Sequence, residues 1–147
     1  PNTRQMVPAM CQTQCDSGTR ISAHKRYLKI LLIEDNKELA DVFSNLLITM
    51  GHQAAVVHNG AEGIKAAKLM RPDVIFCDIG LPGMSGYEVA KALRSDEETK
   101  TAYLIALTGY VSEYKAGLAV ESGFDDLLTK PVDMKKLEKM LAETDRF

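Results

Sequence analysis

The chain has 147 residues, of which 46% are hydrophobic and 26% charged, and its formal net charge is −2. This length favours one globular domain with a tail, and the near-neutral charge argues against a nucleic-acid partner. Because no apolar run approaches the roughly 18 residues that span a bilayer, we expect no membrane contact by this segment. The odd number of cysteines, with Cys77 inside an expected strand, favours a reducing cytoplasm over a secreted disulfide framework.

The amino-terminal part differs in composition from the rest of the chain. Residues 1–27 mix Pro, Gln, Thr, Ser and Gly without a hydrophobic period, which predicts a flexible tail or linker. The domain itself is expected to span residues 28–144, with 145–147 as its C-terminal end.

Apolar runs and amphipathic stretches alternate through the domain. The runs predict strands at residues 28–33, 54–57, 74–77, 103–107 and 126–128. Helices are predicted after each strand, the first three capped by Asn36, Asn59 and Ser85 and the last two near 112–121 and 137–141. Strict alternation predicts a parallel α/β sheet with right-handed crossovers and helices on both faces.

Such a sheet places the carboxyl ends of all its strands at one edge, where open α/β folds bind their ligands. The polar residues at these ends are Glu34, Asp35, His58, Asp78, Thr108 and Lys130. One crevice would therefore gather three carboxylates, a hydroxyl and an ammonium group. His58 follows an outer strand, and we assign it no catalytic role.

Asp78 is the candidate for the reacting group. It follows the buried run 74–77 and leads into a loop that contains Gly80, Gly83 and Gly86. A carboxylate that attacks phosphorus forms an acyl phosphate, which is an established covalent strategy. Service as a metal ligand alone, or as a helix cap, remains an alternative for this residue.

The other polar groups suit a phosphoryl site with a metal ion. Three close carboxylates repel one another unless a cation lies among them, and Mg²⁺ prefers such oxygen ligands. Taken alone, Glu34 and Asp35 would read as a solvated strand end, and Lys130 as a surface lysine in a turn. Beside the acids, Lys130 would contact a phosphoryl oxygen, as would the hydroxyl of Thr108.

Four motifs carry a resemblance to a known family. They are Ile-Glu-Asp-Asn at 33–36, Asp-Ile-Gly-Leu-Pro-Gly-Met-Ser-Gly at 78–86, Ala-Leu-Thr-Gly at 106–109 and Phe-Asp-Asp-Leu-Leu-Thr-Lys-Pro at 124–131. With these motifs in order, the sequence over 28–144 resembles the receiver domain of two-component response regulators. The resemblance implies a flavodoxin-like fold with strand order 2-1-3-4-5.

The resemblance also implies a role for each matching residue. Asp78 would be the phosphoacceptor, with Lys130 and Thr108 contacting the phosphoryl oxygens beside the backbone N–H groups of Ile79 and Gly109. The implied cofactor is Mg²⁺, or Mn²⁺, held by Glu34, Asp35, Asp78 and the Gly80 carbonyl. In the family, the threonine couples to an aromatic residue three positions before the lysine. Here that position holds Leu127, so the aromatic switch is absent in its usual form.

The implied partner is a histidine kinase or a histidine phosphotransfer domain, and the implied protein is a cytoplasmic signalling phosphoacceptor rather than an enzyme. The motifs favour a receiver attached to a hybrid histidine kinase. If that kinase is a membrane-bound sensor, the receiver would be tethered to the membrane through it. Residues 111–143 would form the homodimer or output contact. Two rivals are a pseudo-receiver that docks partners without phosphorylation and an aspartyl-phosphate phosphohydrolase. The second would be expected to have an acid where this chain has Gly80.

Overall fold

The computed structural model describes residues 27–142; the tail predicted at 1–27 lies outside the described residues except for Tyr27. Within the described part, five strands alternate with five helices, as the hydrophobic pattern predicts. In chain order the elements are β1 (Lys29–Ile33), α1 (Lys37–Thr49), β2 (Gln53–Val57), α2 (Gly60–Met70), β3 (Val74–Asp78), α3 (Gly86–Ser95), β4 (Tyr103–Thr108), α4 (Glu113–Ser122), β5 (Asp126–Thr129) and α5 (Met134–Ala142).

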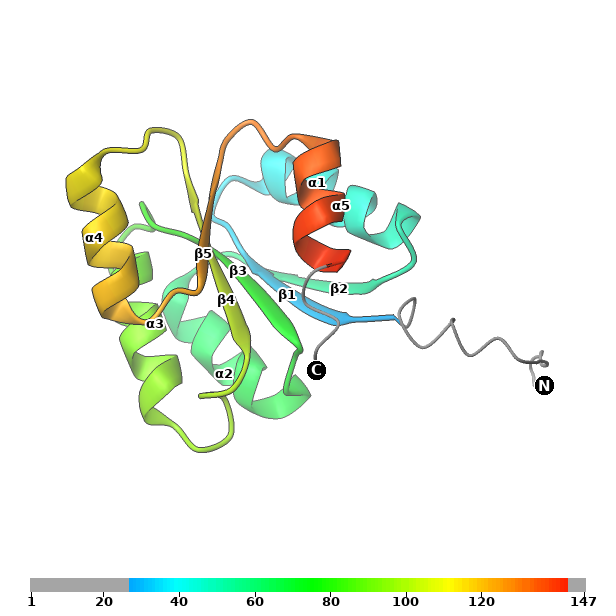
Figure 1. Ribbon diagram of the computed structural model, residues 1–147. Helices are drawn as coiled ribbons and strands as arrows, with labels where there is room; N and C mark the ends of the chain where they lie inside the picture. Colours follow the sequence, from blue (N-terminus) through cyan, green and yellow to red (C-terminus); the bar gives the residue numbers. More distant parts are fainter. Residues whose placement is uncertain (1–26, 143–147) are drawn as a thin grey trace.

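The strands form one parallel sheet in the order β2-β1-β3-β4-β5, which confirms the predicted flavodoxin-like topology (Figure 1). Ile33 of β1 pairs with Cys77 of β3, and Asp78 pairs with Leu107 of β4. The register therefore aligns the carboxyl ends of the three central strands. It decides which polar residues meet at that edge.

Two hydrophobic cores cover the two faces of the sheet, because side chains alternate along each strand. In β1, Leu31 and Ile33 belong to the core that also contains residues of α2, α3 and α4. Ile30 and Leu32 belong to the core beneath α1 and α5. All five residues of β3 are buried. Burial on both faces explains why the central strands are continuous apolar runs rather than alternating ones.

The helix starts agree with the capping signals in the sequence. The side chains of Asn36 and Asn59 accept backbone N–H groups at the starts of α1 and α2. Ser85 and Glu88 form a reciprocal capping box at α3. Each cap fixes where the chain leaves the strand edge and enters a helix, and so shapes the loops around that edge.

Four strands are one residue longer than predicted: β2 begins at Gln53, and β3, β4 and β5 end at Asp78, Thr108 and Thr129. The extensions of β3 and β4 concern the site. β3 includes Asp78 and β4 includes Thr108, each of which was expected just beyond its strand. Both residues are buried and hydrogen-bonded within the sheet. Their backbones are therefore held by the sheet rather than by mobile loops.

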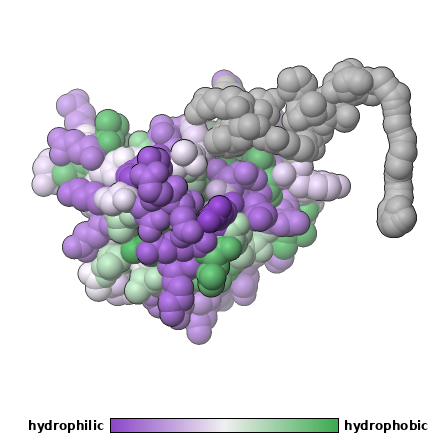
Figure 2. Space-filling model, turned by 90° about the horizontal axis from the view of Figure 1, so that it is seen from below, coloured by the Kyte–Doolittle hydropathy of each residue, from purple (hydrophilic) through white to green (hydrophobic). Residues whose placement is uncertain are grey.

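The surface opposite the carboxyl edge is mainly polar. Figure 2 shows this face, seen from below, as predominantly hydrophilic around smaller hydrophobic patches, over the part that the grey atoms leave visible. Among the described residues, no helix is long and apolar enough to cross a membrane.

Candidate phosphoryl and metal site

Three carboxylates meet where β1 and β3 end. Glu34 and Asp35 follow β1, and Asp78 is the last residue of β3. One ligand oxygen from each lies within 4.8 Å of the other two. Glu34 and Asp78 are 1% and 8% exposed, whereas Asp35 is exposed to solvent. The cluster therefore has two buried acids and one solvent-exposed acid.

Lys130, the residue directly after β5, brings a positive charge to the acids. Its Nζ lies 2.8 Å from Glu34 Oε1 and 3.2 Å from Asp78 Oδ2. Its backbone N–H donates to the Thr108 carbonyl at 2.8 Å, which extends the β4–β5 ladder to the residue itself. Because β4 separates β3 from β5, the side chain reaches across the end of β4 to the acids.

One ammonium group faces three carboxylates, so the cluster keeps an excess of negative charge. Burial raises the pKa of Glu34, and the nearby charge of Asp78 adds to this effect despite the contact with Lys130. For Lys130, burial acts to lower the pKa, but the hydrogen bond to Glu34 and the charges of both acids outweigh it. The pKa of Lys130 is therefore raised. The lysine stays charged, and a divalent cation would offset the remaining negative charge.

Cys77 lies next to Asp78 but is not a competing nucleophile. Burial raises the pKa of its thiol well above the usual range, and the charges of Asp78 and Glu34 act in the same direction. Because the thiolate is the reactive form, this buried cysteine stays inert.

The other donors near Asp78 form hydrogen bonds within the protein. The Thr108 hydroxyl donates to the Tyr110 carbonyl at 2.9 Å and accepts the Tyr110 N–H at 3.3 Å, so it faces the β4–α4 loop. The Ile79 N–H donates to the Leu107 carbonyl at 3.0 Å. The N–H of Gly80 donates to Asp78 Oδ1 at 3.1 Å. The backbone donor at this carboxylate is Gly80, and the N–H of Ile79 completes the β3–β4 ladder.

Gly109 and Leu127 complete the set predicted from the sequence. Gly109 is exposed, and the space where a side chain would project is open. Leu127 is half-buried and packs against the core beneath α2, α3 and α4. Leu127 therefore acts as a packing residue in this structure.

Two residues near the acids were not predicted to contribute. The Asn36 N–H donates to Glu34 Oε2 at 3.1 Å, although the sequence indicated only a helix cap at Asn36. The ring of His58 contacts the Glu34 carbonyl at 2.9 Å. The only signals in the sequence were their positions. Asn36 lies two residues after Glu34, and His58 follows the strand that neighbours β1.

Gly86 supports the site through close backbone packing. A Cβ at this position would lie 2.5 Å from the Asp78 carbonyl oxygen and 2.7 Å from Ile79 Cα. We expect Gly86→Ala to displace the end of β3 and to lower the free energy of unfolding by about 1–3 kcal/mol. Urea denaturation measures the stability change.

Gly117→Ala is the matched control for that substitution. Gly117 lies inside α4, with open space where a Cβ would project. Alanine there should stabilise the protein by about 0.5–1 kcal/mol. A Gly86→Ala variant as stable as the unsubstituted protein would contradict the packing argument.

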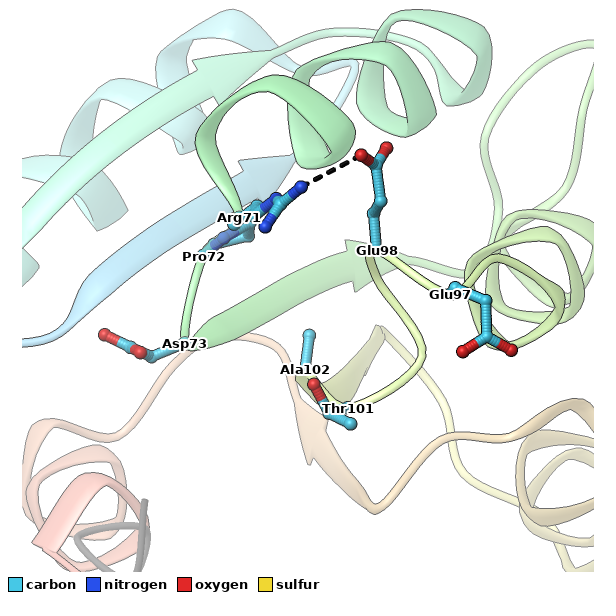
Figure 3. Close-up of a pocket in the computed structure, with 7 residues that line it drawn as sticks. All are labelled: Arg71, Pro72, Asp73, Glu97, Glu98, Thr101 and Ala102. Atoms are coloured by element: carbon cyan, nitrogen blue, oxygen red, sulfur yellow. Dashed lines mark hydrogen bonds and ion pairs between the residues drawn. The ribbon is translucent and has the colours of Figure 1, made fainter.

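A pocket of about 520 Å³ lies away from the acids. Its lining residues are Arg71, Pro72, Asp73, Glu97, Glu98, Thr101 and Ala102 (Figure 3). They precede β3 and β4, whereas Asp78 ends β3, so the pocket is at the opposite edge of the sheet. The Arg71–Glu98 pair across it, at 2.9 Å, is largely exposed. The pocket has the features of a surface ion-pair region rather than of a reaction site.

Comparison with known proteins agrees with this geometry. The family model for the response regulator receiver domain matches residues 30–142. DNA-binding response regulator MtrA of Mycobacterium tuberculosis is 35% identical over 109 residues, which cover 74% of this chain and 46% of MtrA. The chain thus spans about half the length of such curated relatives. Protein PilH of Pseudomonas aeruginosa is 32% identical over 113 residues, covering 77% of this chain and 93% of PilH.

Solved structures show the same architecture. Chemotaxis protein CheY4 of Vibrio cholerae is 28% identical, with a TM-score of 0.77, over 81% of this chain and 99% of that one. The receiver domain of sensor histidine kinase PA1611 from Pseudomonas aeruginosa is 27% identical, with a TM-score of 0.76. The match covers 83% of this chain and all of that domain, whose structure has a magnesium ion coordinated in its active-site cleft.

Proposed function

Because this chain belongs to the family of response regulator receiver domains, we propose that it is a phosphoacceptor whose Asp78 receives a phosphoryl group from a partner histidine. The observation that carries this proposal is the position of Asp78. It is a buried carboxylate at the end of a central strand, with a lysine 3.2 Å away and two further acids beside it. This is the arrangement needed to bind and accept a dianionic group.

In the proposed step, an Asp78 carboxylate oxygen attacks the phosphorus of a phosphohistidine. A phosphorus–oxygen bond forms as the phosphorus–nitrogen bond breaks, and the imidazole leaves with the bonding electron pair and takes up a proton from solvent. The product is an acyl phosphate. Hydrolysis by water, or transfer to a second histidine, returns the free carboxylate.

The chain's own donors account for the orientation of the reacting group. Lys130 Nζ contacts Asp78 Oδ2, and in this proposal it contacts a phosphoryl oxygen once the group is attached to Asp78. The Gly80 N–H contacts the other carboxylate oxygen, Oδ1. In this proposal Thr108 turns its hydroxyl from Tyr110 to the phosphoryl group, and the backbone N–H of Gly109, an exposed residue, provides a further donor.

The acidic cluster fits a hard divalent cation. Its oxygen donors carry three negative charges against one lysine, and Mg²⁺ or Mn²⁺ takes such ligands. We propose Glu34, Asp35, Asp78 and the Gly80 carbonyl as the ligands. When bound, the ion would neutralise charge on the transferring group.

We further propose a partner that presents a phosphohistidine, in a histidine kinase or a histidine phosphotransfer domain. The contact that changes with phosphorylation is proposed to include residues 111–143, of which the structure describes 111–142. Tyr114 and Val120 of α4 expose 75% and 73% of their surface there. Both side chains are accessible to a partner.

Incubation with a small phosphodonor and Mg²⁺ tests the proposal. Intact-mass spectrometry should show one phosphoryl group per chain, labile to hydroxylamine as acyl phosphates are. A pseudo-receiver would bind its partners but gain no phosphate. Repeated turnover of a generic phosphate ester would instead favour the phosphohydrolase.

A further inference from the structure

His58 directly follows β2, the edge strand whose end contributes none of the predicted site residues, and its ring contacts the backbone of one of the acids. Its ring Nδ1 lies 2.9 Å from the backbone carbonyl oxygen of Glu34. A carbonyl oxygen can only accept a hydrogen bond, so Nδ1 must carry the proton and donate it. The bonding partner thus determines the tautomer of this half-buried ring.

The backbone of Glu34 is held entirely by the end of β2. Its N–H donates to the Val57 carbonyl at 3.0 Å, and its carbonyl accepts from His58. The residue is 1% exposed, so water would not readily replace a lost donor at this carbonyl. A substitution that removes the donor therefore favours rotation of the peptide unit toward another partner.

That peptide unit connects the two adjacent acids. The Glu34 carbonyl belongs to the rigid plane that joins the Cα atoms of Glu34 and Asp35. Holding this plane restricts the two backbone torsions that flank it, ψ of Glu34 and φ of Asp35, on which the relative placement of the two side chains depends. A small cation such as Mg²⁺ requires near-octahedral ligand geometry, so it is sensitive to that relative placement.

We propose that His58 is a positioning residue that aims the Glu34–Asp35 pair at a divalent cation. This inference rests on the proposed function, because it takes those acids to be metal ligands. Groups that orient the ligands of a metal commonly change its affinity by about 10–100-fold when removed. The inference gives the edge strand β2 a specific role in the chemistry at the end of β3.

The chain contains a matched control at the other end of the same strand pair. His52 precedes β2, and its Nδ1 accepts the backbone N–H of Leu28 at 3.1 Å. It is also a half-buried histidine that links β1 to β2. However, it lies at the amino edge of the sheet, away from the acids. Its removal should loosen the strand pair without redirecting Glu34.

The test is calorimetric titration of Mg²⁺ alone into the full chain and its variants. His58→Phe retains a ring but removes the donor, and we expect it to weaken Mg²⁺ binding about tenfold or more. His58→Asn places an amide N–H near the position of Nδ1 and should restore the affinity to within about threefold. His52→Leu should bind Mg²⁺ like the unsubstituted chain. Circular dichroism checks folding, and His58→Leu is a second donor-free variant in case the phenylalanine does not fit.

Each alternative result is decisive. Unchanged Mg²⁺ affinity in a folded His58→Phe or His58→Leu variant would overturn the positioning role while the proposed function stands. If His52→Leu weakened Mg²⁺ binding as much as His58→Phe, the positioning role would also be overturned, because general loosening of β1 and β2 would then explain both effects. Failure of the unsubstituted chain to bind Mg²⁺ would overturn both proposals.

Discussion

Replacing Asp78 with asparagine abolishes phosphoryl uptake in our account. The amide lacks the anionic oxygen that attacks phosphorus, and no acyl phosphate can form at this position. The side chain keeps its size, so the buried end of β3 should remain folded. Incubation with a small phosphodonor and Mg²⁺, followed by intact-mass spectrometry, should show no added phosphoryl group.

Asp41→Asn is the matched control, because Asp41 is an exposed acid on α1. It should take up phosphate at the rate of the unsubstituted chain. Uptake by Asp78→Asn at that same rate would assign the chemistry to another residue. Cys77, the adjacent candidate, is excluded by its buried and protonated thiol.

Replacing Lys130 with methionine should slow phosphoryl uptake by roughly 100-fold or more, the usual cost of removing a preorganised charge from a reacting group. Lys130 contacts both buried acids, at 2.8 Å and 3.2 Å, and nothing else in the described part of the chain offsets their charge so closely. Methionine keeps most of the side-chain volume. The measured quantity is the initial rate of uptake at saturating Mg²⁺.

The same substitution should also raise the pKa of Glu34 further, because it removes the opposing contact with the ammonium group. Lys135→Met, at an exposed site on α5, is the control and should leave the rate unchanged. A Lys130→Met variant that is phosphorylated at the original rate would contradict the role given to Lys130.

The fold followed from the sequence because its signals were local and consistent. Hydrophobic runs, caps at Asn36 and Ser85 and strict alternation each indicate the same parallel sheet, and the structure has that sheet. The meeting of Glu34, Asp78 and Lys130 also followed, since parallel strands end at one edge. Strand ends were less certain because an apolar run does not indicate whether the first polar residue after it, such as Asp78 or Thr108, still pairs with the neighbouring strand.

Hydrogen-bond directions were not predictable in the same way. Ile79 and Gly80 are adjacent, and only the β3–β4 register decides which N–H completes the ladder and which meets the carboxylate. Thr108 likewise bonds to Tyr110 because of the shape of the loop that follows it. The predicted strand order already placed β2 beside β1, but not that the ring of His58 would bond to the backbone carbonyl of Glu34 rather than face solvent.

Attachment of the phosphoryl group to Asp78 can be tested directly. Borohydride reduces an acyl phosphate to an alcohol, which would convert a phosphorylated Asp78 to homoserine. Peptide mapping after exposure to a phosphohistidine donor, Mg²⁺ and borohydride locates that residue. We expect homoserine at position 78. Homoserine at another aspartate, the corresponding five-carbon alcohol at a glutamate, or neither product while phosphate is stably incorporated elsewhere would contradict this assignment.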